Sequence, residues 1–157
     1  MGWGIFSTIL LGALAVLLVS AGIEDVRKRE IANWKNAAIA CLAPLWWMAS
    51  GLPLWPGVVI QIGLAAAVFA IFVGAFALGQ MGGGDAKLIG AVALWLPFQP
   101  LAWMLVAMSL IGGALTVLLV VERWWLKSRT AIEVPYGVAI VIAALFAFRE
   151  PILNRFG

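Results

Sequence analysis

The chain has 157 residues, of which 65% are hydrophobic and 11% are charged, and its net charge is +3. This composition supplies too little polar surface for a water-soluble globule, so we expect one membrane-embedded domain over residues 1–157. The lack of histidine and the single cysteine, Cys41, exclude histidine-activated nucleophiles, a disulfide within the chain and a cysteine-based metal site.

Six apolar segments alternate with polar or glycine- and proline-containing breaks. A helix needs roughly 20 apolar residues to cross a bilayer, and fewer where the membrane thins. The pattern therefore predicts an all-α polytopic bundle of about six transmembrane helices, with the first, third and fifth segments long and the others short. In chain order the predicted segments are residues 3–23, 36–51, 57–79, 86–99, 101–122 and 135–149.

Basic residues set the expected orientation, because Lys and Arg accumulate on the cytoplasmic side of a membrane. Eight of the ten fall on one side of six alternating segments, which predicts both termini outside. Residues 1–23 are interpreted as a retained helix and not a cleaved signal peptide, because the basic cluster follows the apolar run. The eight residues are Arg27, Lys28, Arg29, Lys35, Lys87, Arg123, Lys127 and Arg129.

Two aspartates stand where polar breaks meet apolar segments on that same side. Asp25 follows the first segment, and Asp85 precedes the fourth after a run of glycines. A carboxylate at a membrane border is unfavourable and usually functional. If the first and fourth segments pack together, the two form a pair in which one carboxyl group is a general base and the other an acid, with the assignment open.

The neighbours of these aspartates suggest supporting functions. Gly82 and Gly84 allow a substrate strand to approach the backbone closely. Glu24 is either a second candidate acid or a solvated charge at a helix end.

Three sequence patches resemble type IV prepilin peptidases, a family of GxGD intramembrane aspartyl proteases. Residues 82–88, Gly-Gly-Gly-Asp-Ala-Lys-Leu, are similar to the family's G-x-G-D-x-K-L signature. Residues 135–140 are similar to its P-Y-G-x-A-I patch. A D-x-R-x-x-x-I-P-N stretch is matched by Asp25, Arg27, Ile31 and Asn33, with Ala32 in place of the proline.

The resemblance implies a protease that removes the short basic leader of prepilins at the cytoplasmic face of the bacterial inner membrane. It implies Asp25 and Asp85 as catalytic residues and needs neither metal nor organic cofactor. The lack of paired Cys-x-x-Cys motifs matches the compact form of tight-adherence or Flp-type pili, so no N-methyltransferase activity is expected. Residues implied in substrate binding or loop shape are Gly82, Gly84, Lys87, Arg27, Asn33 and Tyr136.

Several of these side chains have a second interpretation. Lys87 either stabilises charge near Asp85 or extends to the interface, and Arg27 is mainly a topology determinant. Asn33 either caps the second helix or holds the loop against Asp25, with capping favoured. Tyr136 either donates a hydrogen bond in the site or anchors a helix at the interface.

Other functions stay open beside the peptidase. A small carrier or channel subunit would use the aspartates to bind a cation or relay protons. A catalytically silent scaffold for pilus assembly would not need them. A related protease would act on an archaeal preflagellin or a pseudopilin. The expected partners are a prepilin-like precursor and membrane lipids and not nucleic acid, with the oligomeric state open.

Overall fold

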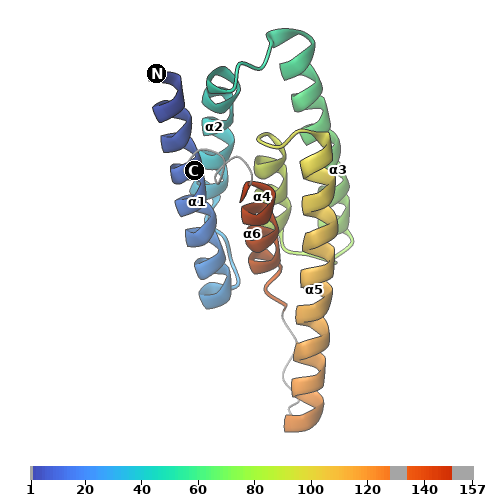
Figure 1. The fold of residues 1–157 in the computed structure, drawn as a ribbon. Helices are drawn as coiled ribbons and strands as arrows, with labels where there is room; N and C mark the ends of the chain where they lie inside the picture. The colour runs from blue at the N-terminus through green and yellow to red at the C-terminus, as the bar shows by residue number, and fades with distance from the viewer. Residues whose placement is uncertain (1, 128–133, 150–157) are drawn as a thin grey trace.

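The computed structural model describes residues 2–127 and 134–149, and within these ranges it is all-helical with no strand (Figure 1). This confirms the predicted all-α class. Three helical stretches are long and apolar enough to cross a membrane, and they correspond to the first, third and fifth predicted segments. The elements are α1 (Gly2–Lys28), α2 (Asn33–Ala49), the short π-helical turn η1 (Leu54–Val58), α3 (Val59–Ala77), α4 (Gly83–Ala93), α5 (Phe98–Leu126) and α6 (Tyr136–Ala147).

Helix α1 continues beyond its predicted end at residue 23. Asp25 therefore lies within the last helical turn and does not follow the helix. The helix ends at Lys28, and the next residue, Arg29, has a left-handed φ of 56° and donates its N–H to the Asp25 carbonyl oxygen at 2.9 Å. Because α2 begins at Asn33, only residues 29–32 connect the two helices.

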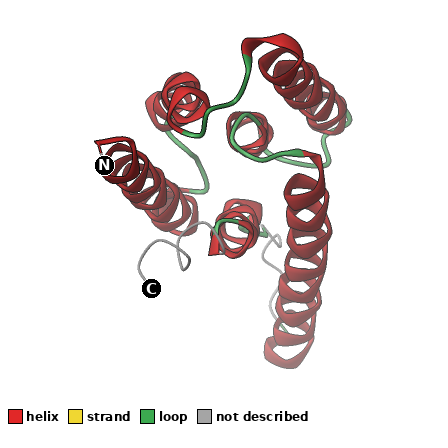
Figure 2. Cartoon of the chain, turned by 45° about the horizontal axis from the view of Figure 1, so that its top comes forward, coloured by secondary structure: helices red, strands yellow, loops and turns green. Residues whose placement is uncertain are grey.

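Helix α4 is short and lies among the longer helices (Figure 2). Its 11 residues span about 16 Å at 1.5 Å per residue, about half of a bilayer's hydrocarbon core. It ends before the predicted boundary at residue 99 because side chains satisfy carbonyl groups at its end. Gln61 Nε2 donates to the carbonyl oxygens of Ala93 and Leu96, both at 2.7 Å, and Trp47 Nε1 donates to that of Leu94 at 2.7 Å.

The packing places one end of four helices together. Helix α1 packs against α2 and α6, while α4 packs against α2, α3 and α6. Thus α2 and α6 connect the first and fourth predicted segments. The last turn of α1 and the first turns of α2, α4 and α6 lie toward the same end, beyond which α5 projects (Figure 1). Both predicted aspartates are at this end.

Candidate active site

Asp25 is held between α1 and the start of α6. The residue is only 5% exposed. A Cβ atom at Gly137 would lie 2.7 Å from both Cγ and Oδ2 of Asp25, so this position tolerates only glycine without displacement of the carboxylate. Among the described residues Oδ2 has no hydrogen-bond partner of standard geometry. The amides of Gly137 and Val138 interact with the carboxylate electrostatically, as expected at the positive end of a helix.

Asp85 lies in the first turn of α4 and is 8% exposed. A Cβ atom at Gly82 would lie 3.1 Å from its Oδ2, so the carboxylate folds back over the residue that precedes the helix. A Cβ atom at Gly84 would lie 3.3 Å from the backbone nitrogen of Ile31. Gly84 therefore lets the loop after α1 approach the turn that carries Asp85.

The charge of Asp25 acts on the carboxyl group of Asp85. Asp85 lies outside the three long apolar helices and before the predicted segment 86–99. Burial, reinforced by the charge of Asp25, raises the pKa of Asp85 to about 6, against an opposing effect of the Gly82 backbone amide. A carboxyl group with such a pKa is partly protonated near neutral pH, as acid catalysis requires.

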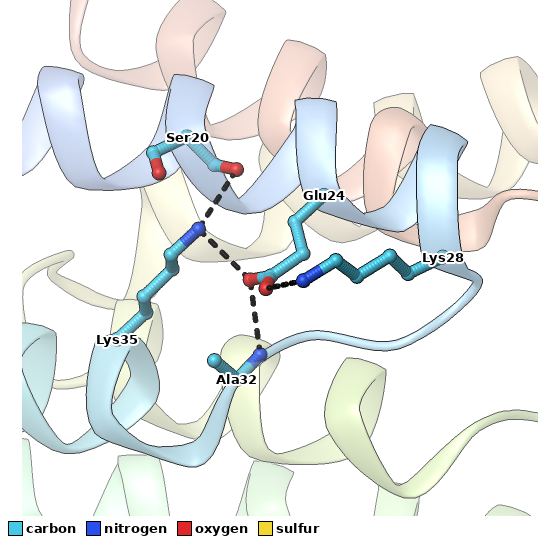
Figure 3. A network of polar contacts seen from close by, with 5 residues as sticks. All are labelled: Ser20, Glu24, Lys28, Ala32 and Lys35. Carbon is cyan, nitrogen blue, oxygen red and sulfur yellow. Dashed lines mark hydrogen bonds and ion pairs between the residues drawn. The ribbon is translucent and has the colours of Figure 1, made fainter.

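Glu24, next to Asp25, anchors the loop between α1 and α2 (Figure 3). Its Oε2 lies 2.8 Å from Nζ of Lys35 and accepts a 3.2 Å hydrogen bond from the Ala32 N–H. Lys35 is 7% exposed and also donates to the Ser20 carbonyl oxygen at 3.1 Å, while Lys28 Nζ lies 3.6 Å from Oε1. Glu24 is thus a structural partner of the loop, and its interpretation as a solvated helix-end charge is wrong.

Asn33 connects α2 to α4 and does not cap α2. The N-cap is Ala32, which makes no side-chain capping bond, so the capping prediction is wrong. Asn33 Oδ1 instead accepts a 2.8 Å hydrogen bond from Nζ of the exposed Lys87. One turn later, Asn36 Nδ2 donates to the Gly84 carbonyl oxygen at 3.3 Å. Asn36 therefore fixes α2 against the residue before Asp85, and Asn33 fixes it against Lys87 in α4.

The structure shows no hydrogen bond or ion pair from the side chains of Arg27 and Tyr136 to the two aspartates among the described residues. Arg27 is exposed on α1. The Tyr136 ring is half-buried against α5, where a Cβ atom at Gly112 would lie 3.1 Å from it. Tyr136 therefore serves in the described structure as a packing contact between α5 and α6.

Sequence reasoning gave no role in the site to three supporting residues: Lys35, Asn36 and Gln61. Each is a polar residue within or beside an apolar segment. That is the one signal the sequence offers, because a polar group in such a place needs a partner. The partners themselves, Glu24, Gly84 and the end of α4, are distant or ambiguous in sequence.

Fold and site together define an integral membrane protein with two buried aspartates at one end of a helical bundle. Residues 12–117 match the family model described as the Type IV leader peptidase family. Since this is more than half of the chain, the protein belongs to that family, whose general activity is that of an aspartic peptidase, a hydrolase of leader-bearing precursors. The matched range contains Asp25 and Asp85 and ends before Tyr136. No curated protein and no solved structure matches the chain.

Proposed function

We propose that this protein is a prepilin leader peptidase of the bacterial inner membrane that cleaves the basic leader of Flp-type prepilins at the cytoplasmic border. The observation that carries the proposal is the pair of buried aspartates, 5% and 8% exposed, with the charge of Asp25 acting on Asp85. Two carboxyl groups so placed differ in their readiness to ionise, as an acid and a base in one site must.

The proposed reaction is hydrolysis without a covalent intermediate. One carboxylate takes a proton from water, and the water oxygen bonds to the carbonyl carbon of the scissile peptide. The other carboxyl group, protonated, donates to the carbonyl oxygen. The carbon–nitrogen bond then breaks, and the leaving nitrogen receives a proton from the pair. Asp25 and Asp85 titrate as a unit, so the two roles are assigned to the pair.

The short connection between α1 and α2 supports the compact form of the family. Residues 29–32 are all that separate the helices, and the chain has one cysteine. A connection of this length has no room for a zinc-binding loop with paired cysteines. The proposed product is therefore a mature pilin with an unmethylated N-terminus.

The test is co-expression with Flp-type prepilins in membranes, comparing wild type with Asp25→Asn and Asp85→Asn. Mass spectrometry of the pilin N-terminus should show leader removal lost in each variant and an unmethylated product from wild type. Glu30→Gln, an exposed acid in the neighbouring loop, is the matched control and should cleave normally. Leader removal that persists in both aspartate variants would contradict the proposal and favour a scaffold or carrier.

A further inference from the structure

Gln61 is a buried amide in a helix whose other side chains are all apolar. It lies near the start of α3 and is 8% exposed. The stretch Leu54–Ala77, which contains it, is long and apolar enough to cross a membrane. Polar side chains at such a depth are unfavourable without a partner and commonly have a function. The reaction proposed above assigns none to Gln61.

The partners of Gln61 are at the end of α4. Its Nε2 donates to the carbonyl oxygens of Ala93 and Leu96, both at 2.7 Å. The carbonyl oxygen of Leu94, between them in sequence, accepts a 2.7 Å hydrogen bond from Trp47 Nε1 of α2. A helix that ends in an apolar environment leaves carbonyl groups that water cannot satisfy. The two side chains take the place of water there, and Gln61 supplies two of the three hydrogen bonds.

The sequence explains why these two carbonyl groups need a side chain. In a helix each carbonyl oxygen accepts from the N–H group four residues later. For Ala93 that residue is Pro97 and for Leu96 it is Pro100, and proline has no N–H. No backbone donor at the helical spacing can therefore replace Gln61, whose amide supplies both missing hydrogen bonds.

Contacts of α3 also fix how α4 is aligned beside it. Gln61 meets the end of α4, Phe69 its middle and Phe76 its first residue, so the two helices run antiparallel. A Cβ atom at Gly90 would lie 2.6 Å from the Phe69 ring, and one at Gly83 would lie 3.2 Å from the Phe76 ring. Both rings are exposed and can adjust, whereas hydrogen bonds depend on distance and angle. Gln61 is therefore the contact of α3 that fixes α4 along its axis.

We propose that Gln61 is a positioning residue for Asp85, because its two hydrogen bonds hold α4 at the depth that the reaction requires. The inference rests on the proposed peptidase function. Asp85 and Ala93 lie at opposite ends of this 11-residue helix, about 12 Å apart along its axis at 1.5 Å per residue. Gln61 thus acts on Asp85 through the helix. Without the amide, two carbonyl groups lack donors in an apolar environment, so this end of the helix rearranges and Asp85 shifts with it.

The first test compares the kinetics of Gln61→Met and Val68→Ala on a Flp-type prepilin. Methionine keeps the length of glutamine but has no donor. Val68 is buried on the same helix, and its truncation removes apolar packing without removing a hydrogen bond. Gln61→Met should lower kcat about 100-fold with KM unchanged, the effect of a displacement of about 1 Å, whereas Val68→Ala should keep the wild-type kcat. Equal kcat values for the two variants would overturn the inference, because Gln61 would then act through stability alone.

The second test measures the position of the first turn of α4 without any cleavage. A Cβ atom at Gly84 would lie 3.3 Å from Cβ of Ile31, close to the separation of about 3.8 Å in a disulfide. In a Cys41→Ser background, Ile31→Cys combined with Gly84→Cys should therefore crosslink on oxidation. Adding Gln61→Met should lower the yield severalfold, whereas adding Val68→Ala should leave it unchanged.

The outcomes separate this inference from the proposed function. A crosslink yield that Gln61→Met leaves unchanged would overturn the inference, as would a pair that fails to crosslink with Gln61 in place. Because the crosslink forms without substrate, a wild type that does not cleave prepilins overturns the proposed function and not the role of Gln61 in holding α4.

Discussion

At the scale of the residue, the ionisation of Asp85 makes the folded state less stable as the pH rises. The pKa of Asp85 is raised from 3.8 to about 6. Burial is the larger cause, and the charge of Asp25 is the smaller one. Between these values the unfolded chain releases the proton and the folded chain retains it. Stability therefore falls from about pH 4 to about pH 6 and stays lower above that range.

Asp85→Asn removes this dependence because asparagine does not ionise. We expect the variant to melt at a higher temperature than wild type above about pH 6, with the difference vanishing near pH 4. The measurement is the thermal midpoint of purified protein in detergent across this range. A difference that is constant with pH would show that Asp85 does not carry the raised pKa.

Gly137 is the second residue whose identity follows from the site. Alanine there would place its Cβ 2.7 Å from the Asp25 carboxylate, so the carboxylate must move. A displacement of about 1 Å can lower a rate about 100-fold, which is the fall in kcat expected for Gly137→Ala. Gly22→Ala is the control on the facing helix, since its Cβ would meet Val141 at an ordinary 3.4 Å. Equal rates for the two variants would contradict this geometry.

At the scale of the element, the Glu24–Lys35 ion pair ties the first turn of α2 to α1. Lys35→Met leaves Glu24 without its nearest cation, and Glu24→Gln leaves a nearly buried ammonium group without its carboxylate partner. Each single variant should lower the thermal midpoint, and the double variant should lose less than their sum. Calorimetry of the four proteins provides this comparison. Additive losses would mean that the two side chains stabilise the protein independently.

The contact of α5 with α6 depends on one of two adjacent glycines. A Cβ at Gly112 would press on the Tyr136 ring at 3.1 Å, whereas a Cβ at Gly113 meets no atom within 4 Å. Gly112→Leu should therefore destabilise the protein by about 1–3 kcal/mol and lower activity, because α6 carries Gly137 against Asp25. Gly113→Leu should change neither. Urea or thermal unfolding of both variants tests this difference, and similar behaviour would exclude Gly112 as the contact.

Helix type and length were predictable where hydropathy alone decides them. The three long helices follow from uninterrupted apolar sequence. The ends of α1 and α4 could not be predicted, because contacts with distant parts of the chain determine them. Polar residues continue α1 through Asp25, and Gln61, far along the chain, satisfies the carbonyl groups where α4 ends. Asn33 was expected to cap α2 because local propensity favours it, but its partner Lys87 is 54 residues away.

At the scale of the whole molecule, the aspartate pair could be predicted as two residues at one depth but not as neighbours. The prediction depended on direct packing of the first and fourth segments. In the structure α2 and α6 each pack against both helices, and α6 contributes Gly137 to the Asp25 site. Sequence periodicity does not specify which helices of a membrane bundle are adjacent, since all are apolar around most of their circumference.

The distribution of charge predicts how the bundle is oriented. The loop after α1 and the first turns of α2 and α4 contain basic residues at the aspartate end, which should face the cytoplasm. In a Cys41→Ser background, Glu30→Cys should resist a membrane-impermeant thiol reagent in intact spheroplasts and react in inverted vesicles. Ser50→Cys, exposed at the opposite end of α2, should show the reverse pattern. Labelling of Glu30→Cys from outside would place the aspartates on the outer side, where they could not process a leader at the cytoplasmic border.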